Sequence, residues 1–96
     1  MSAILSRIEK ILSPQKYRLR VGLIHLTERA RSFGLSENDV ANAIEAIDHN
    51  EGGLALDIIL VQLYEYSIPV DKEFVDFAEE LSSSVGINWD KYGFIH

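Results

Sequence analysis

The three histidines are the first side chains to consider for chemistry. His25, His49 and His96 are too widely spaced to form an HxxxH or HExxH pair, which would put two nitrogen ligands on one face of a helix. The chain has no cysteine, so thiolate metal sites, disulfides and cysteine nucleophiles are excluded. We therefore expect no metal.

One segment has part of the pattern of a calcium loop. Asp48, Asn50 and Gly53 take the first, third and sixth positions. Ile59 stands at the twelfth position, where calcium needs a bidentate carboxylate, so we reject a calcium site. The sequence also lacks a G-x-S-x-G motif and a glycine-rich phosphate loop. We expect neither an enzyme nor a bound cofactor.

Length and composition predict one small globular domain over residues 1–96. The chain is 47% hydrophobic and 25% charged, as in ordinary folded domains, and no apolar run approaches the length that crosses a bilayer. The first residues have no basic segment ahead of a long apolar one, which argues against a secretory signal. With no cysteine, these features predict a cytoplasmic protein.

Charge is distributed unevenly along the chain. The net charge is −6, but residues 1–31 hold seven of the nine basic residues and two of the fifteen acidic ones, a net +5. Residues 32–96 therefore carry −11. An acidic region of this size repels nucleic acid and attracts a basic protein surface, although charge also serves solubility alone.

Apolar spacing predicts helices throughout, and hence an all-α, compact bundle of about five helices. Gly34 is expected to end one helix, and Ser36 and Asp71 to cap the starts of two others. Trp89, Tyr92 and Phe94 predict an aromatic C-terminal tail packed on the body. The expected helices are residues 2–12, 14–33, 36–50, 54–67 and 71–84, with 54–67 central.

The helix over residues 54–67 has a mixed outer side opposite its expected core face. The predicted core face is Ala55, Leu56, Ile59, Leu60, Leu63 and Tyr66, and the outer side is Asp57, Ile58, Val61, Tyr64 and Glu65. An aromatic side chain next to acids is typical of recognition surfaces. Contact of Ile58 and Val61 with another helix is the structural alternative. Adding nearby acids, the candidate partner-binding residues are Asp48, Glu51, Asp57, Val61, Tyr64, Glu65, Asp71 and Glu73.

The helix over residues 14–33 has two apolar stripes, which leaves two other functions open. Its second stripe, Tyr17, Val21 and Ile24, either packs inside the bundle or pairs with a second copy in a homodimeric adaptor. The alternative is a nucleic-acid-binding helical module that uses Arg18, Arg20, Arg29 and Arg31. These arginines lie on two flanks rather than on one stripe, and the sequence pI is about 4.9, which argues against that module.

Two short motifs resemble the signature of MafI-type immunity proteins. The family pattern is close to G-E-Y-G-L-A-L-E followed by Q-L-Y-E-Y-D-I-P-I. The matching residues are Glu51, Gly53, Leu54, Ala55, Leu56, Gln62, Leu63, Tyr64, Glu65, Tyr66, Ile68 and Pro69. Asn50, Gly52 and Ser67 depart from it, Asp57 and Val70 are conservative, and the resemblance covers about residues 33–81.

The resemblance implies a small cytoplasmic immunity protein of a polymorphic-toxin or contact-dependent-inhibition system. Such proteins neutralise a cognate toxin domain by tight binding, and the toxins are often nucleases, including EndoU-like ribonucleases. We therefore expect a 1:1 complex with a basic toxin domain, no direct contact with nucleic acid or membrane, and a monomeric free protein. The expected mechanism is that Tyr64, Glu65, Asp57, Glu51 and Asp48 cover the cleft in which the toxin binds RNA.

Overall fold

The computed structural model describes residues 13–93, which form four α-helices and a short 3₁₀ helix. No strand occurs in this part of the chain. The elements are α2 (Pro14–Phe33), α3 (Glu37–Asp48), α4 (Gly52–Glu65), α5 (Lys72–Ser84) and η1 (Trp89–Tyr92). The all-α prediction is confirmed, but the count of about five helices is wrong for the described residues, and the helix expected at 2–12 lies outside them.

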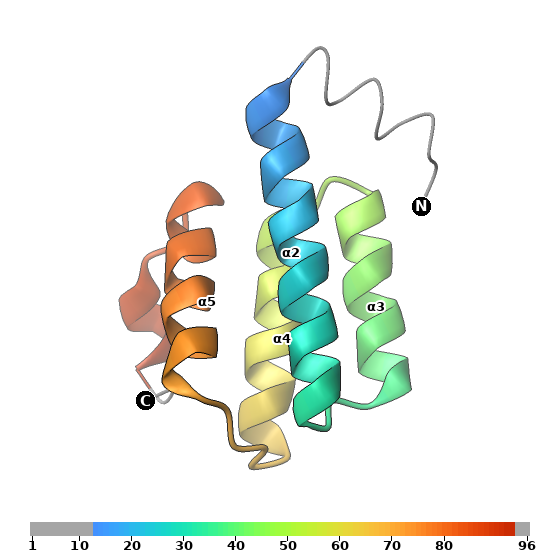
Figure 1. Cartoon of the computed structure of the whole chain (residues 1–96), viewed down its shortest axis with the longest axis vertical. Coiled ribbons are helices and arrows are strands. Elements are labelled where there is room, and N and C mark those ends of the chain that lie inside the picture. Colours follow the sequence, from blue (N-terminus) through green and yellow to red (C-terminus); the bar gives the residue numbers. More distant parts are fainter. Residues whose placement is uncertain (1–12, 94–96) are drawn as a thin grey trace.

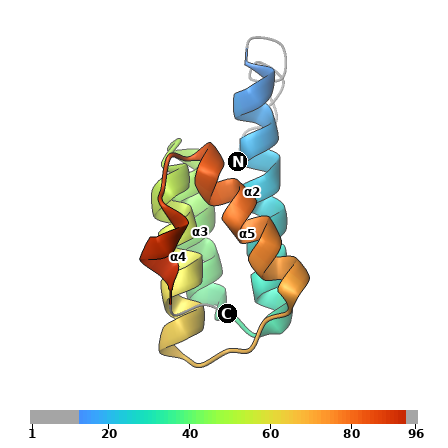
Figure 2. The same cartoon turned by 90° about the vertical axis from the view of Figure 1, so that its left-hand side faces the viewer.

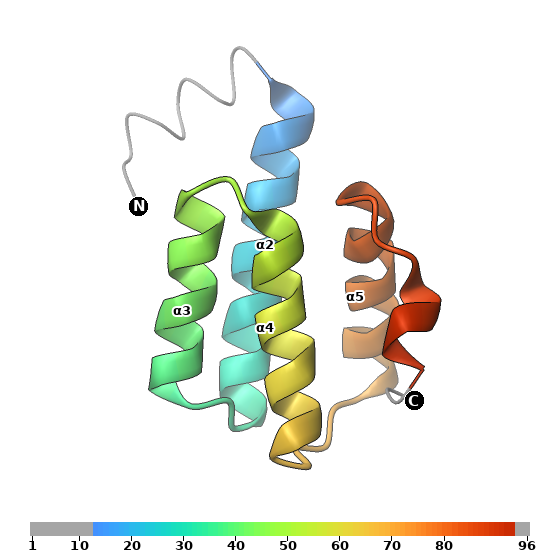
Figure 3. The same cartoon turned by 180° about the vertical axis from the view of Figure 1, so that it is seen from behind.

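The four helices alternate in direction along the bundle (Figure 1). α2 lies in front of α4, with α3 on one side and α5 on the other. α4 packs mainly against α3, whereas α2 contacts α3, α4 and α5. Seen from behind, α4 is the foremost helix, so one side of it is not covered by another helix (Figure 3). The centre of the bundle is thus shared by α2 and α4, rather than occupied by α4 alone.

Local sequence signals set most of the helix ends. Pro14 begins α2, where its missing N–H costs nothing. Gly34 ends α2 with φ 122°, and the Leu35 N–H donates to the Ala30 carbonyl at 3.0 Å. Ser36 Oγ accepts from the Asp39 N–H, and Asp71 Oδ1 accepts from the Phe74 N–H at 2.8 Å. These caps were all predicted from the sequence.

The start of α4 differs from the prediction, because Gly52 lies inside the helix. A Cβ at Gly52 would lie 3.0 Å from Leu23 Cδ1 and 3.2 Å from Val85 Cγ1. The glycine is therefore explained by close packing of α4 against α2 and the segment after α5, rather than by a break between helices. The prediction also placed Tyr66 in the core, whereas it caps α4 and is 65% exposed.

The prediction of an aromatic C-terminal tail packed on the body is not supported as made, because the described residues of the tail form no aromatic cluster. η1 contacts α5 and lies in front of α4 in the view of Figure 2, and Tyr92 is fully buried. Trp89 is half-buried, with its ring centroid 5.5 Å from that of Tyr92. Phe94 lies outside the described residues; within them Tyr92 is the buried aromatic side chain of the tail, and Trp89 packs partly buried against the core.

Candidate partner-binding face

The exposed large hydrophobic side chains of the described chain lie on α4 and at its C-cap. Leu54 is 49% exposed, Tyr64 is 55% exposed and Tyr66 is 65% exposed, and among residues 13–93 these are the exposed large hydrophobic side chains. Half-buried Ile58 and Val61 lie between Leu54 and Tyr64 at helical spacing. We define the α4 outer face as Leu54, Ile58, Val61, Tyr64 and Glu65.

A shallow hollow adjoins this face where α4 meets α3. Ala46, Leu54 and Ile58 supply its apolar lining, and we call the two exposed acids that line it, Glu45 and Glu51, its rim. Glu51 is the N-cap residue of α4, yet its side chain makes no capping hydrogen bond. We define the α3–α4 hollow by the residues that line it: Asn42, Glu45, Ala46, His49, Glu51, Leu54 and Ile58.

A buried arginine from α2 fixes the turn that carries one rim of the hollow. Arg20 is 4% exposed, and its Nη2 donates to Asn50 Oδ1 at 3.0 Å. Its Nη1 lies 3.5 Å from Asp48 Oδ1 in an ion pair. Asn50 is left-handed with φ 59°, a conformation that asparagine tolerates better than most residues. Arg20 thereby binds the last residue of α3 and the middle of the short link between α3 and α4.

His49 occupies the same turn as the C-cap residue of α3. Its Nδ1 lies 2.9 Å from the Glu45 carbonyl oxygen. A carbonyl can only accept, so Nδ1 donates in this bond. The contact holds the imidazole next to Glu45 on the rim of the hollow.

Asp57 contacts two side chains of η1 in the C-terminal tail. Its Oδ1 accepts a hydrogen bond from the Tyr92 hydroxyl at 3.0 Å and lies 3.0 Å from Lys91 Nζ. Burial raises the pKa of the Tyr92 hydroxyl above its usual value, and the bond to Asp57 raises it further. The three side chains join η1 to α4, so this structural contact is enough to explain why an acid stands at Asp57.

Asp71 and Glu73 lie against α2 rather than on the α4 outer face. Arg29 Nη2 lies 3.3 Å from Asp71 Oδ2, and Arg29 Nη1 lies 3.5 Å from Glu73 Oε1. This cluster joins the start of α5 to α2. Asp71 also caps α5, so both acids have partners within the bundle.

The eight residues predicted from the sequence thus fall into two groups. Glu51, Val61, Tyr64 and Glu65 share the α4 side of the molecule. Asp48, Asp57, Asp71 and Glu73 make intramolecular ion pairs. Of the seven residues that line the hollow, the prediction included only Glu51, and the exposed Glu45 and Leu54 are among the six that it omitted. Glu45 precedes His49 by one helical turn, and that spacing was the available signal.

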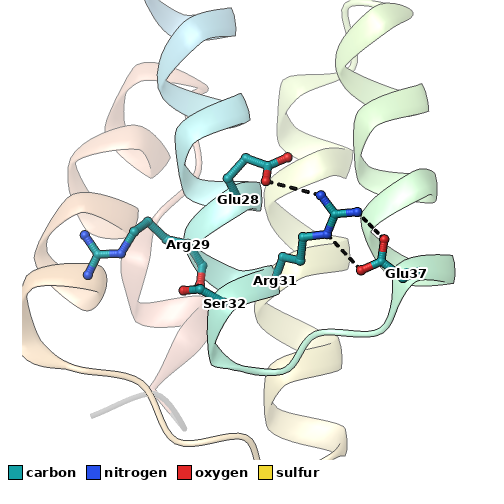
Figure 4. Close-up of polar contacts among 5 residues, drawn as sticks. All are labelled: Glu28, Arg29, Arg31, Ser32 and Glu37. Carbon is teal, nitrogen blue, oxygen red and sulfur yellow. Dashed lines mark hydrogen bonds and ion pairs between the residues drawn. The ribbon is translucent and has the colours of Figure 1, made fainter.

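Three of the four arginines proposed for nucleic-acid binding are buried or form ion pairs within the bundle. Arg20 is buried and Arg29 is paired, as described above. Arg31 bonds to Glu37 at the start of α3 and to Glu28 on its own helix, whereas Arg29 points away from this cluster (Figure 4). The bond to Glu37 raises the pKa of Arg31 and lowers that of Glu37. Of the four arginines, Arg18 has no ion pair with another described residue.

The second stripe of α2 contributes to the bundle. Ile24 packs against the core, and Tyr17 and Val21 are half-buried. Residues 13–93 contain no group of three or more His, Asp or Glu side chains arranged to hold a metal ion. No helix in this range has the length and apolar character needed to cross a membrane.

Comparisons with known protein families, with curated proteins and with solved structures find no match to this chain. The resemblance to MafI-type immunity proteins therefore rests on the two sequence motifs, and the structure adds the geometry of the surface on which those motifs lie. Glu51, Leu54, Tyr64, Glu65 and Tyr66 of these motifs are exposed, whereas Leu56 and Leu63 are buried.

Proposed function

We propose that this chain is a cytoplasmic immunity protein that neutralises a toxin domain by binding it through the α4 outer face. One observation carries the proposal: the exposed large hydrophobic side chains of the described chain, Leu54, Tyr64 and Tyr66, all belong to α4 or its C-cap. Exposed tyrosine and leucine next to half-buried aliphatic side chains supply the apolar centre of an interface.

The charge around this face favours a basic partner. Residues 32–71, which include α3 and α4, contain no lysine and no arginine. Within the described residues Glu45, Glu51 and Glu65 make no ion pair, whereas the acids elsewhere in this segment are largely used for caps and intramolecular pairs. Unpaired acids around an apolar centre accelerate the encounter with a basic surface and select against acidic ones. A nuclease, whose substrate is a polyanion, is the class of toxin that presents such a surface.

The mechanism requires no catalytic group on this chain. Binding of the α4 outer face to the toxin would cover the basic cleft in which the toxin holds RNA, so that the substrate is excluded by the inhibitor's bulk and by its negative charge. A rigid surface on a packed helix suits this task, because little conformational entropy is lost on binding.

The test uses the toxin domain encoded beside this chain, in a 1:1 mixture scored for complex formation and for ribonuclease activity. The double variant Tyr64→Ala/Glu65→Lys removes one aromatic anchor and reverses one charge. We expect it to weaken binding by about 2–5 kcal/mol and to restore toxin activity at concentrations where the wild type inhibits.

The matched control is Glu79→Lys on α5, which changes the net charge by the same amount at an exposed residue far from α4 in the sequence. It should bind as the wild type does. Absence of any complex between the wild-type chain and the toxin would overturn the proposed function, and equal loss in both variants would remove α4 from the interface.

A further inference from the structure

The α3–α4 hollow combines apolar lining with two carboxylates that make no ion pair with a described residue. Leu54 is 49% exposed and half-buried Ile58 lies beside it, so the hollow exposes aliphatic surface to solvent. Glu45 and Glu51 stand on its rim. Uncovered aliphatic surface between two carboxylates suits a side chain with an apolar stem and a cationic head.

No described side chain neutralises this rim. Glu45 and Glu51 make no ion pair within residues 13–93, and α3 and α4 carry no lysine or arginine. The contrast with the rest of the bundle is direct, because Arg29 and Arg31 each contact two acids. Glu45 and Glu51 are therefore not used by the described part of the bundle and remain available to a cation of a binding partner.

The rim is also held in place before any partner binds. Arg20 fixes Asn50 and Asp48 on either side of His49, and His49 bonds back to the Glu45 carbonyl. The Glu51 N–H donates to the Ala46 carbonyl at 2.8 Å, which closes the turn across the hollow. Preorganisation of this kind lowers the entropy lost on binding.

From these observations we infer that the α3–α4 hollow receives an arginine side chain of the toxin, with its stem on Leu54 and its guanidinium between Glu45 and Glu51. Arginine fits better than lysine, because the guanidinium is more weakly hydrated, spreads its donors over a planar fork and is enriched in interface cores from which lysine is depleted. This inference rests on the proposed function. It adds the α3–α4 hollow, which adjoins the α4 outer face, to the proposed interface with the toxin.

The first experiment compares two double variants of the full chain in binding to the toxin domain by calorimetry. Glu45→Gln/Glu51→Gln removes the charges of the rim, and Glu79→Gln/Glu80→Gln removes two exposed acids of α5 as the control. We expect the first to raise the Kd at least about 30-fold and the second to leave it within about threefold of the wild type. Equal Kd values for both double variants would overturn the inference while leaving the proposed function intact, and no wild-type complex would overturn both.

The second experiment identifies the occupant with hexa-arginine and hexa-lysine peptides, followed by amide chemical shifts of the full ¹⁵N-labelled chain. Hexa-arginine should shift amides of residues 45–54, and Glu45→Gln/Glu51→Gln should abolish those shifts. Equal shifts with hexa-lysine, or shifts centred on α5, would contradict an arginine site. The other possible occupant of the hollow is a second copy of this chain, which sedimentation of the free chain tests. We expect a monomer; a dimer that Leu54→Glu breaks would mean that a second copy fills the hollow and would overturn the inference.

Discussion

The two sides of the bundle use their charged side chains differently. On the side where α2 meets the first turns of α3 and α5, Arg29 contacts Asp71 and Glu73, while Arg31 contacts Glu28 and Glu37. On the side of the α4 outer face, Glu45, Glu51 and Glu65 make no ion pair with a described residue. Three of the five basic residues of α2, Arg20, Arg29 and Arg31, are thus paired within the molecule, whereas these three acids around α4 are not.

This difference separates charges that shape the fold from charges that remain available to a partner. An acid that caps a helix or pairs with arginine is already accounted for by the fold, as Asp71 and Asp57 are. An exposed acid with neither role is accounted for only by solubility or by binding. We therefore include Glu45, Glu51 and Glu65 in the proposed interface. The acids with partners in the bundle are left out of it: Asp48, Asp57, Asp71 and Glu73.

The largest expected effect on stability comes from Arg20, the buried cation that connects the two sides. Arg20→Ala removes the ion pair to Asp48, the hydrogen bond to Asn50 and the packed arginine stem. We expect a loss of about 3 kcal/mol in the free energy of unfolding, at the lower end for breaking a buried pair because Asp48 is 31% exposed. Urea denaturation followed by circular dichroism measures it.

Arg20→Met is the informative companion, since it keeps most of the stem and removes only the charge. If Arg20→Met is as stable as the wild type while Arg20→Ala is not, the stem rather than the polar network stabilises the turn. Such a result would contradict a stabilising role for the bonds from Arg20 to Asn50 and Asp48.

Tyr92 provides the next largest effect and a dependence on pH. Because its pKa is raised in the folded chain, the protonated phenol contributes stability below the unfolded pKa of about 10, and this contribution is lost as pH rises above that value. Tyr92→Phe removes the hydrogen bond to Asp57, and we expect a cost of about 1 kcal/mol at pH 7. Between pH 9 and pH 11 the free energy of unfolding should fall less steeply in this variant than in the wild type.

Comparing the two proteins at each pH separates Tyr92 from the lysines, which titrate in the same range in both. An identical alkaline slope for Tyr92→Phe and the wild type would show that the phenol does not set the alkaline stability. Unchanged stability at pH 7 would show that Lys91 alone is sufficient to hold Asp57.

The fold could be predicted to this extent because its signals are local. Gly34, Ser36 and Asp71 act on the backbone within a few residues, so their types and spacing identified the helix ends correctly. Gly52 was misread because the reason for that glycine is distant in the sequence: the side chains of Leu23 and Val85 occupy the space that a Cβ would need. A pattern on one helix contains no information about that contact.

The candidate site was harder to predict for the same reason. An acid looks the same in the sequence whether or not an arginine lies opposite it, and the partners of Asp57 and Asp71 are 34 and 42 residues away from them. Three of the predicted residues, Val61, Tyr64 and Glu65, lie on one helix, and helical periodicity alone was enough to group them. Glu45 joins the site because α3 packs beside α4, which no periodicity within α4 reveals.

The smallest effect on stability is expected from the exposed ion pairs on the α2 side. Arg31→Gln removes the bonds to Glu37 and Glu28, all three of which are solvent-exposed side chains. Exposed ion pairs contribute little to stability, because two flexible side chains are ordered in a strongly screening solvent. We expect no shift of the urea midpoint beyond experimental error.

The same substitution also raises the negative charge of the chain by one and frees Glu28 and Glu37. If binding depended on total negative charge, Arg31→Gln would tighten the complex with the toxin as much as Glu51→Gln weakens it. We expect instead that Arg31→Gln leaves the Kd within about threefold of the wild type, since a screened charge beyond about 10 Å contributes little at physiological ionic strength. Titrations of both variants at two salt concentrations decide between a local contact at α4 and a general attraction between opposite charges.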